Sequence, residues 1–126
     1  MSVRMKRLFV LAIALLCGCV NSEETYVSVV ERTIKKGPVV ACCPVFKGAD
    51  PEKQRADCEA TAPVRCAFVK DATSIRRKSL SRFGHDDGAM VEVDVSGPNG
   101  HGVCQYQVLN YPRGDLHIDG GDCHTP

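Results

Sequence analysis

The stretch AMVEVDV at residues 89–95 has the most regular alternation of apolar and acidic side chains in the chain. In a β-strand, successive side chains point to opposite faces, so Val91, Val93 and Val95 share one face and the acids share the other. Residues 96–102, SGPNGHG, are rich in the residue types that form hairpin turns. We therefore expect a half-buried strand here, followed by a β-hairpin.

Two more strands are predicted after this turn, over residues 103–109 and 116–119. A second turn at residues 110–114 separates them, because asparagine, proline and glycine cluster there. Together with residues 90–95, these strands predict an antiparallel β meander in the C-terminal half of the chain.

One short helix is predicted near residues 51–60. Asp50 can cap it, Pro51 suits the first helical position, and Glu52 lies in the positively polarised first turn. Pro63 is expected to end the helix, because the residue before a proline is disfavoured in helical conformation. A helix combined with a β meander predicts a small domain of the α+β class.

Residues 26–34 have two competing patterns. Their β-branched side chains favour a strand. In a helix, by contrast, Tyr26, Val30 and Ile34 would share one face. We expect the strand.

Three other segments have weaker patterns. Residues 39–43 are a short apolar run, and residues 63–69 alternate as a strand would. Residues 71–83 predict either an irregular strand anchored by Ile75 and Leu80 or an exposed excursion of the chain.

The N-terminus has the composition of an export signal. Arg4, Lys6 and Arg7 precede an apolar run at residues 8–16, which matches the charged and apolar regions of a secretory signal peptide. The run is too short to span a bilayer, which needs ~20 apolar residues. At its end, LCGC at residues 16–19 resembles the lipobox of bacterial lipoproteins, in which an aliphatic residue and a small residue precede the cysteine.

This resemblance implies that residues 1–18 are a signal peptide that is removed, and that Cys19 carries diacylglycerol and an N-acyl chain. Two or more acyl chains anchor a protein stably to a membrane. Residues 19–25 would then be the lipidated cysteine and a tether. Residues 26–126 would form a single extracytoplasmic domain in the periplasm or outside the cell.

The residue after the lipidated cysteine indicates whether such a lipoprotein stays in the inner membrane. Val20 differs from the aspartate that retains many such lipoproteins in the inner membrane of Gram-negative cells. The resemblance therefore implies the periplasmic face of the outer membrane in such a host. Ordinary secretion, with cleavage after the AIA triplet at residues 12–14, is the alternative.

An even set of cysteines in a small exported domain predicts a disulfide framework. Adjacent side chains of a strand point to opposite faces, so Cys42 and Cys43 should have different partners. We expect these partners to be Cys58 and Cys66, in either order. Cys104 is expected to pair with Cys123. No spacing typical of a zinc site is present. The six candidates are Cys42, Cys43, Cys58, Cys66, Cys104 and Cys123.

The residues Arg76, Arg77 and Lys78, with Arg82, form a concentrated basic run. Such a patch could contact anionic lipid headgroups, an anionic glycan or an acidic partner protein. A solvated loop is the alternative, because charge runs are commonly surface features. In a regular strand, Arg77 and Leu80 would lie on opposite faces.

A cluster of carboxylates and imidazoles near the C-terminus could bind a divalent metal, although its spacing is not that of a calcium loop. A solvated sheet face also explains it. A nucleophilic pair of His101 and Cys104 is conceivable, but an exported cysteine in an even set is expected to be oxidised. The clustered residues are His117, Asp119, Asp122, Cys123 and His124.

The sequence favours a non-enzymatic envelope lipoprotein whose domain binds another macromolecule, as an assembly accessory or an inhibitor of an incoming protein. A small metal-binding protein or hydrolase built on residues 117–124 is the alternative, and a purely structural lipoprotein is a third. Without its signal peptide the chain has 13 basic and 15 acidic residues, a net charge of −2. This balance predicts no nucleic-acid partner, and no motif predicts a cofactor.

Overall fold

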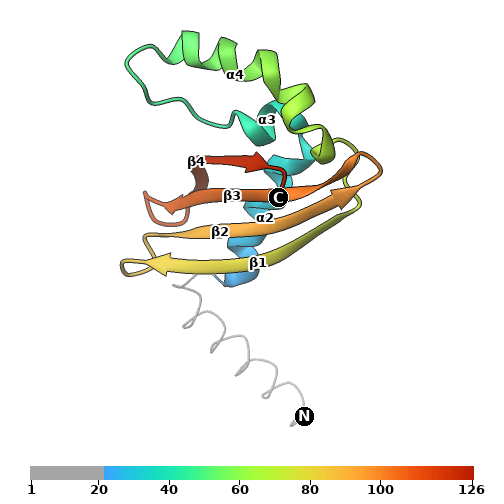
Figure 1. The fold of residues 1–126 in the computed structure, drawn as a ribbon. Helices are drawn as coiled ribbons and strands as arrows, with labels where there is room; N and C mark the ends of the chain where they lie inside the picture. The colour runs from blue at the N-terminus through green and yellow to red at the C-terminus, as the bar shows by residue number, and fades with distance from the viewer. Residues whose placement is uncertain (1–21) are drawn as a thin grey trace, which may run out of the picture.

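The computed structural model describes residues 22–126, so the predicted signal peptide and Cys19 lie outside the described residues. Within residues 22–126, four strands form one antiparallel sheet with its strands in chain order (Figure 1). The α+β class and the C-terminal meander are therefore confirmed. The strands are β1 (Ser74–Phe83), β2 (Gly88–Gly97), β3 (Gly100–Asn110) and β4 (Leu116–His124).

The alternating stretch forms most of β2, as predicted. Val91, Val93 and Val95 are almost completely buried on one face of the sheet. On β3, Tyr106 lies opposite Val91 and Cys104 lies opposite Val93, and both are fully buried. Burial of these side chains on one face supplies the main driving force for the fold.

Residues 26–34 belong to a helix, α2 (Glu23–Lys35), so the predicted strand is wrong. The Ser22 side chain caps this helix, and Tyr26, Val30 and Ile34 are fully buried on its inner face. The period of four outweighs β-branched content here because the helix can bury that face against the sheet. The last three residues of the predicted tether, residues 19–25, lie in this helix, which begins at Glu23.

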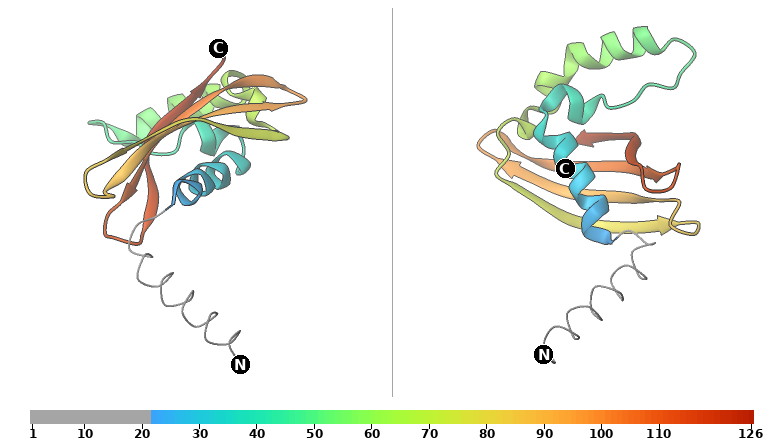
Figure 2. Two further views of the ribbon diagram at one scale, coloured as in Figure 1. Left: turned by 90° about the horizontal axis from the view of Figure 1, so that it is seen from below. Right: turned by 180° about the vertical axis from the view of Figure 1, so that it is seen from behind.

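Helices α2 and α3 lie on one side of the sheet (Figure 2). Helix α2 crosses the sheet face diagonally and leads into α3 (Pro38–Cys42), the short apolar run of the sequence. Helix α4 (Pro51–Arg65) packs against α3 beyond the β4 edge (Figure 1). No helix within residues 22–126 has both the length and the apolar character needed to cross a bilayer.

Helix α4 begins at Pro51 behind its Asp50 cap, as predicted, but it continues through Pro63 to Arg65. The expected stop before Pro63 and the expected strand over residues 63–69 are therefore wrong. Pro63 is exposed and lies in the last turn, where the missing N–H affects few helical hydrogen bonds. A 3₁₀ turn, η1 (Ala67–Val69), follows and buries its apolar side chains in the core.

Three disulfides join the cysteines in the predicted combination. Cys104 pairs with Cys123, its direct neighbour across β3 and β4. Cys42 and Cys43 have different partners, although they lie at the end of helix α3 and not in a strand. Rotation of about 100° per helical residue separates adjacent side chains there. The other two bridges are Cys42–Cys66 and Cys43–Cys58.

Candidate functional site

The basic run lies on β1, at one edge of the sheet, and a β-bulge divides it between two faces. Arg77 lies opposite Val93 on β2. Leu80 lies opposite Val91, so it shares the helix-covered face with Arg77. The prediction that Arg77 and Leu80 lie on opposite faces is wrong because the pairing register shifts between Arg77 and Ser79.

Most of this positive charge is paired with neighbouring carboxylates. Arg76 is the exception, since it forms no salt bridge within residues 22–126. All of these pairs reduce the positive potential of the edge, and the exposed pair of Arg77 with Glu23 contributes only ~0–1 kcal/mol to stability. The pairs are Arg77 with Glu23 on α2, Lys78 with Glu92 on β2 (3.5 Å) and Arg82 with Asp86 (3.7 Å).

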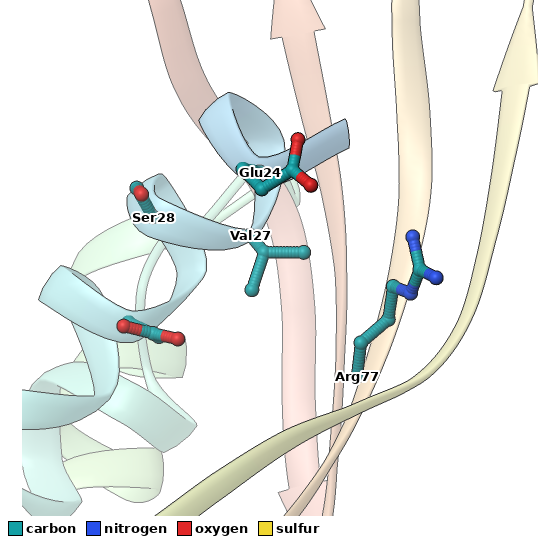
Figure 3. Close-up of a pocket in the computed structure, with 5 residues that line it drawn as sticks. Glu24, Val27, Ser28 and Arg77 are labelled. Atoms are coloured by element: carbon teal, nitrogen blue, oxygen red, sulfur yellow. The ribbon is translucent and has the colours of Figure 1, made fainter. Parts of the chain in front are cut away.

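A shallow cleft of about 360 Å³ lies between α2 and this edge of the sheet. Figure 3 shows Glu24 and Val27 on the side of the helix toward Arg77, and Ser28 also lines the cleft. The lining combines a guanidinium with two carboxylates, those of Glu24 and Glu31. Among the described lining residues, no hydrogen bond joins Ser28 to a base, so they form no assembled nucleophile.

A buried polar cluster holds α2 against the β1–β2 turn. The Tyr26 hydroxyl donates to Asp86 Oδ1 at 2.6 Å, and the Arg82 guanidinium lies 5.6 Å from the centre of the Tyr26 ring. Asn110 donates to the Asp86 carbonyl at 2.8 Å. Burial raises the pKa of Tyr26 to about 12, with the hydrogen bond to Asp86 and the charge of Asp86 acting in the same direction. The cluster therefore holds α2, the β1–β2 turn and the end of β3 together.

The C-terminal carboxylates are paired with cations from other elements. Asp119 lies 2.5 Å from Lys47 Nζ, and Asp122 accepts from Arg65 of α4 at 2.8 Å. Within residues 22–126, the group of three ligand-type residues whose donor atoms lie within 4.8 Å consists of Asp122 and two cysteines of a disulfide. A disulfide lacks the thiolates that a metal would require. The structure therefore does not gather residues 117–124 into such a group.

The conceivable His101 and Cys104 pair is not assembled either. Cys104 is fully buried and bonded to Cys123, so it provides no thiolate. His101 is exposed on β3 next to the hairpin turn.

A groove of about 400 Å³ runs between helices α2 and α3 and the beginning of β4. We name it the α2–β4 groove. Its volume falls in the range of small-ligand pockets. Two cations and an imidazole line its margin, from Arg32, Lys36 and His117, and no carboxylate among the described residues lines it. Its apolar lining comes from Val29, Val40, Pro44, Leu116 and Ile118.

The charges of this groove are available to a ligand. Neither Arg32 nor Lys36 takes part in a salt bridge within the described part of the chain, and both are exposed. This distinguishes them from the basic run on β1, where three of the four cations are paired. An apolar surface bordered by unpaired cations suits an anionic ligand that also has apolar groups.

Among these residues, only His117 belongs to a site predicted from the sequence. Arg32 and Lys36 are four residues apart, which places them together on a helix but separates them in a strand. The strand predicted for residues 26–34 therefore gives no indication that Arg32 and Lys36 are neighbours. The contribution of Val40 and Pro44 depends on the packing of α3 and has no local signature.

The described residues define a class of protein, a small disulfide-stapled α+β domain in which helix α2 covers one face of an antiparallel meander. A groove bordered by basic side chains lies at its β4 edge. No protein-family model, curated protein or solved structure matches the chain.

Proposed function

We propose that this chain is a lipid-anchored envelope protein whose domain is a non-enzymatic binding module. The anchor is supported by the signal-like residues 1–16 and by LCGC at residues 16–19. The disulfides support an oxidising compartment outside the cytoplasm. In a Gram-negative host, the residue after Cys19 favours the periplasmic face of the outer membrane.

The observation that carries the binding function is the α2–β4 groove. It combines an apolar lining with the unpaired cations Arg32 and Lys36. These cations line the same groove as the partly buried Leu116 and Ile118. Solubility alone would not require cations at this position. The groove therefore provides both the apolar contact and the charge selectivity of a recognition surface.

The position of the groove suits a domain that is anchored near its N-terminus. Ser22 caps α2, and the pair between Glu23 and Arg77 holds this end of the helix at β1. The other end of α2 borders the groove beside β4, at the opposite edge of the sheet (Figure 1). An anchor at Cys19 would thus leave the groove open toward the periplasm.

The anchor is tested by intact-mass analysis of the membrane fraction, with the wild-type chain and a Cys19→Ser variant. We expect the wild-type protein to begin at Cys19 with added acyl mass and the variant to leave the membrane. A wild-type mass that retains residues 1–18, or that lacks acyl mass, would contradict the proposal.

The binding module is tested by placing a photo-crosslinking residue at Val40, which is 38% exposed beside the groove. A defined envelope partner should crosslink there and should be lost when Arg32 and Lys36 are both changed to glutamate. The matched control changes Arg76 and Lys78 on β1 to glutamate. Crosslinking that survives the groove change and disappears in the control would assign recognition to the basic run.

A further inference from the structure

Helix α3 packs beside β4, but the outer backbone edge of β4 is not paired with another described segment where it borders the groove. Residues 116–118 pair with β3, and within residues 22–126 they form no backbone hydrogen bond to another segment. An edge strand of this kind presents unpaired N–H and C=O groups to any extended chain that approaches it.

The two edges of the sheet differ in how they are protected. On β1, a bulge at Lys78 and several charged side chains discourage the addition of another strand. On β4, the pairing register also shifts, at Asp119, but residues 116–118 before it pair regularly with β3 and include Leu116 and Ile118, which are partly buried against the core. The density of charged side chains therefore disfavours strand addition at β1 more than at residues 116–118.

The charge of the groove selects the kind of chain that could be added. Arg32 of α2 and Lys36, which directly follows α2, line the groove beside this edge. No acidic side chain among the described residues lines it. A strand that alternates apolar and acidic side chains would direct one set toward the apolar lining and could bring acidic groups near these cations.

We propose that the α2–β4 groove binds an extended acidic segment of a partner protein, which adds to β4 as a fifth strand. Backbone hydrogen bonds to residues 116–118 hold the segment. Apolar side chains contact Val40 and Ile118, and acidic groups pair with Arg32 and Lys36. This inference rests on the proposed binding function and names the partner chemistry of the same site.

The test uses the oxidised, purified full-length protein and a short fluorescent peptide in which valine and glutamate alternate, with binding measured by anisotropy. We expect saturable binding that is lost when lysine replaces glutamate in the peptide. Methylation of alternate backbone nitrogens should weaken binding by roughly tenfold, because it removes hydrogen bonds to the edge. Equal binding of the methylated peptide would overturn strand addition.

The protein variant for this test is the double change Arg32→Gln and Lys36→Gln. It should weaken peptide binding by about fivefold, since the pairs are exposed. Lys35→Gln is the matched control, because this exposed lysine of α2 does not line the groove. Circular dichroism and a free-thiol count that are both unchanged from wild type establish that each variant folds. Equal binding by the double variant and the control would overturn the charge assignment.

A lipid anion is the competing occupant and is tested with dodecanoate. Binding of dodecanoate at the groove without binding of the peptide would overturn the proposal. Absence of acyl mass on Cys19 would refute the anchor while leaving peptide binding intact. If the protein is lipidated but does not bind the peptide, only the inference of strand addition is refuted.

Discussion

The hydroxyl group of Tyr26 joins helix α2 to the turn between β1 and β2. The Tyr26 side chain is fully buried on the inner face of α2, and its hydroxyl group donates a hydrogen bond to Asp86 in this turn. Asp86 has a φ of 60°, in the left-handed region, and Asn110 donates to its carbonyl group. The hydrogen bonds hold Asp86 in this sparsely populated conformation.

The raised pKa of Tyr26 predicts a loss of stability at high pH. The folded pKa is about 12, against the ordinary value of 10.0, so the folded state retains the proton more strongly. The contribution is complete below pH 10 and is lost as pH rises through 12. Burial also raises the pKa of Tyr106, which acts in the same direction.

We therefore expect the urea midpoint of the protein to fall between pH 10 and pH 12, and this fall to be smaller in Tyr26→Phe. Phenolate absorbance, measured in parallel, should rise less near pH 12 in Tyr26→Phe than in the wild type. The control is Tyr111→Phe, at a residue whose side chain is 77% exposed. An identical fall in Tyr26→Phe and wild type would contradict the assignment.

At the scale of the element, β4 is longer than its sequence suggests. The predicted strand ended at residue 119, but β4 continues through two glycines to His124. Gly121 lies opposite Tyr106, with a φ of 147° and no room for a side chain. A Cβ atom there would lie 2.3 Å from the Tyr106 ring and 2.4 Å from the Gln105 carbonyl oxygen.

We expect Gly121→Ala to destabilise the protein by about 1–3 kcal/mol, through this clash and the strained backbone. Gly120→Ala is the matched control, because nothing lies within 4 Å of its added Cβ atom. Its effect should remain below about 0.5 kcal/mol. Urea denaturation measures both, and equal effects would show that the close approach to Tyr106 does not matter.

Helix α4 depends on covalent attachment more than on burial. Among its residues, Ala62 is the buried one, and the rest of the helix contacts mainly α3 and η1. The Cys43–Cys58 bridge closes a separation of 15 residues, and in the chain-entropy model such a closure contributes ~3 kcal/mol.

Replacing Cys43 and Cys58 with serine should therefore loosen α4 while preserving the sheet. Hydrogen exchange should accelerate in the amides of α4 and remain slow in those of β2 and β3. The same replacement of Cys104 and Cys123 is the comparison, and it should accelerate exchange in β3 and β4. Uniform acceleration in the first variant would mean that α4 and the sheet unfold together.

At the scale of the whole molecule, the proposed anchor would orient the domain. Cys19 and Ser22 are three residues apart, a reach of at most ~10 Å. The pair between Glu23 and Arg77 places this end of the chain at β1. The β1 edge would therefore be close to the membrane, and α4 would be far from it (Figure 1).

This orientation predicts unequal labelling of two exposed lysines. On lipidated protein in phosphatidylglycerol-containing vesicles, Lys78 of β1 should react with an amine reagent more slowly than Lys53 of α4. In detergent the difference should diminish, since the micelle imposes no flat surface. Mass spectrometry of peptides gives both rates. An unchanged ratio between vesicles and detergent would show that the anchored domain turns freely.

The sequence by itself determined the parts of this protein that depend on local pattern. The alternation at residues 89–95 placed Val91 and Val93 inward, because the period of a strand is two whatever surrounds it. Asp50 and Pro51 marked the start of α4 for a similar reason, since a helix cap uses neighbouring groups. The predicted cysteine partners also agreed with the structure.

Only the tertiary structure decided between patterns that were both present. Residues 26–34 have strand propensity and a helical period, and the apolar sheet face selected the helix because it buries Tyr26 and Ile34. The bulge beside Arg77 depends on pairing with β2, which no local pattern encodes. The α2–β4 groove joins segments more than seventy residues apart in sequence, and only packing brings them together.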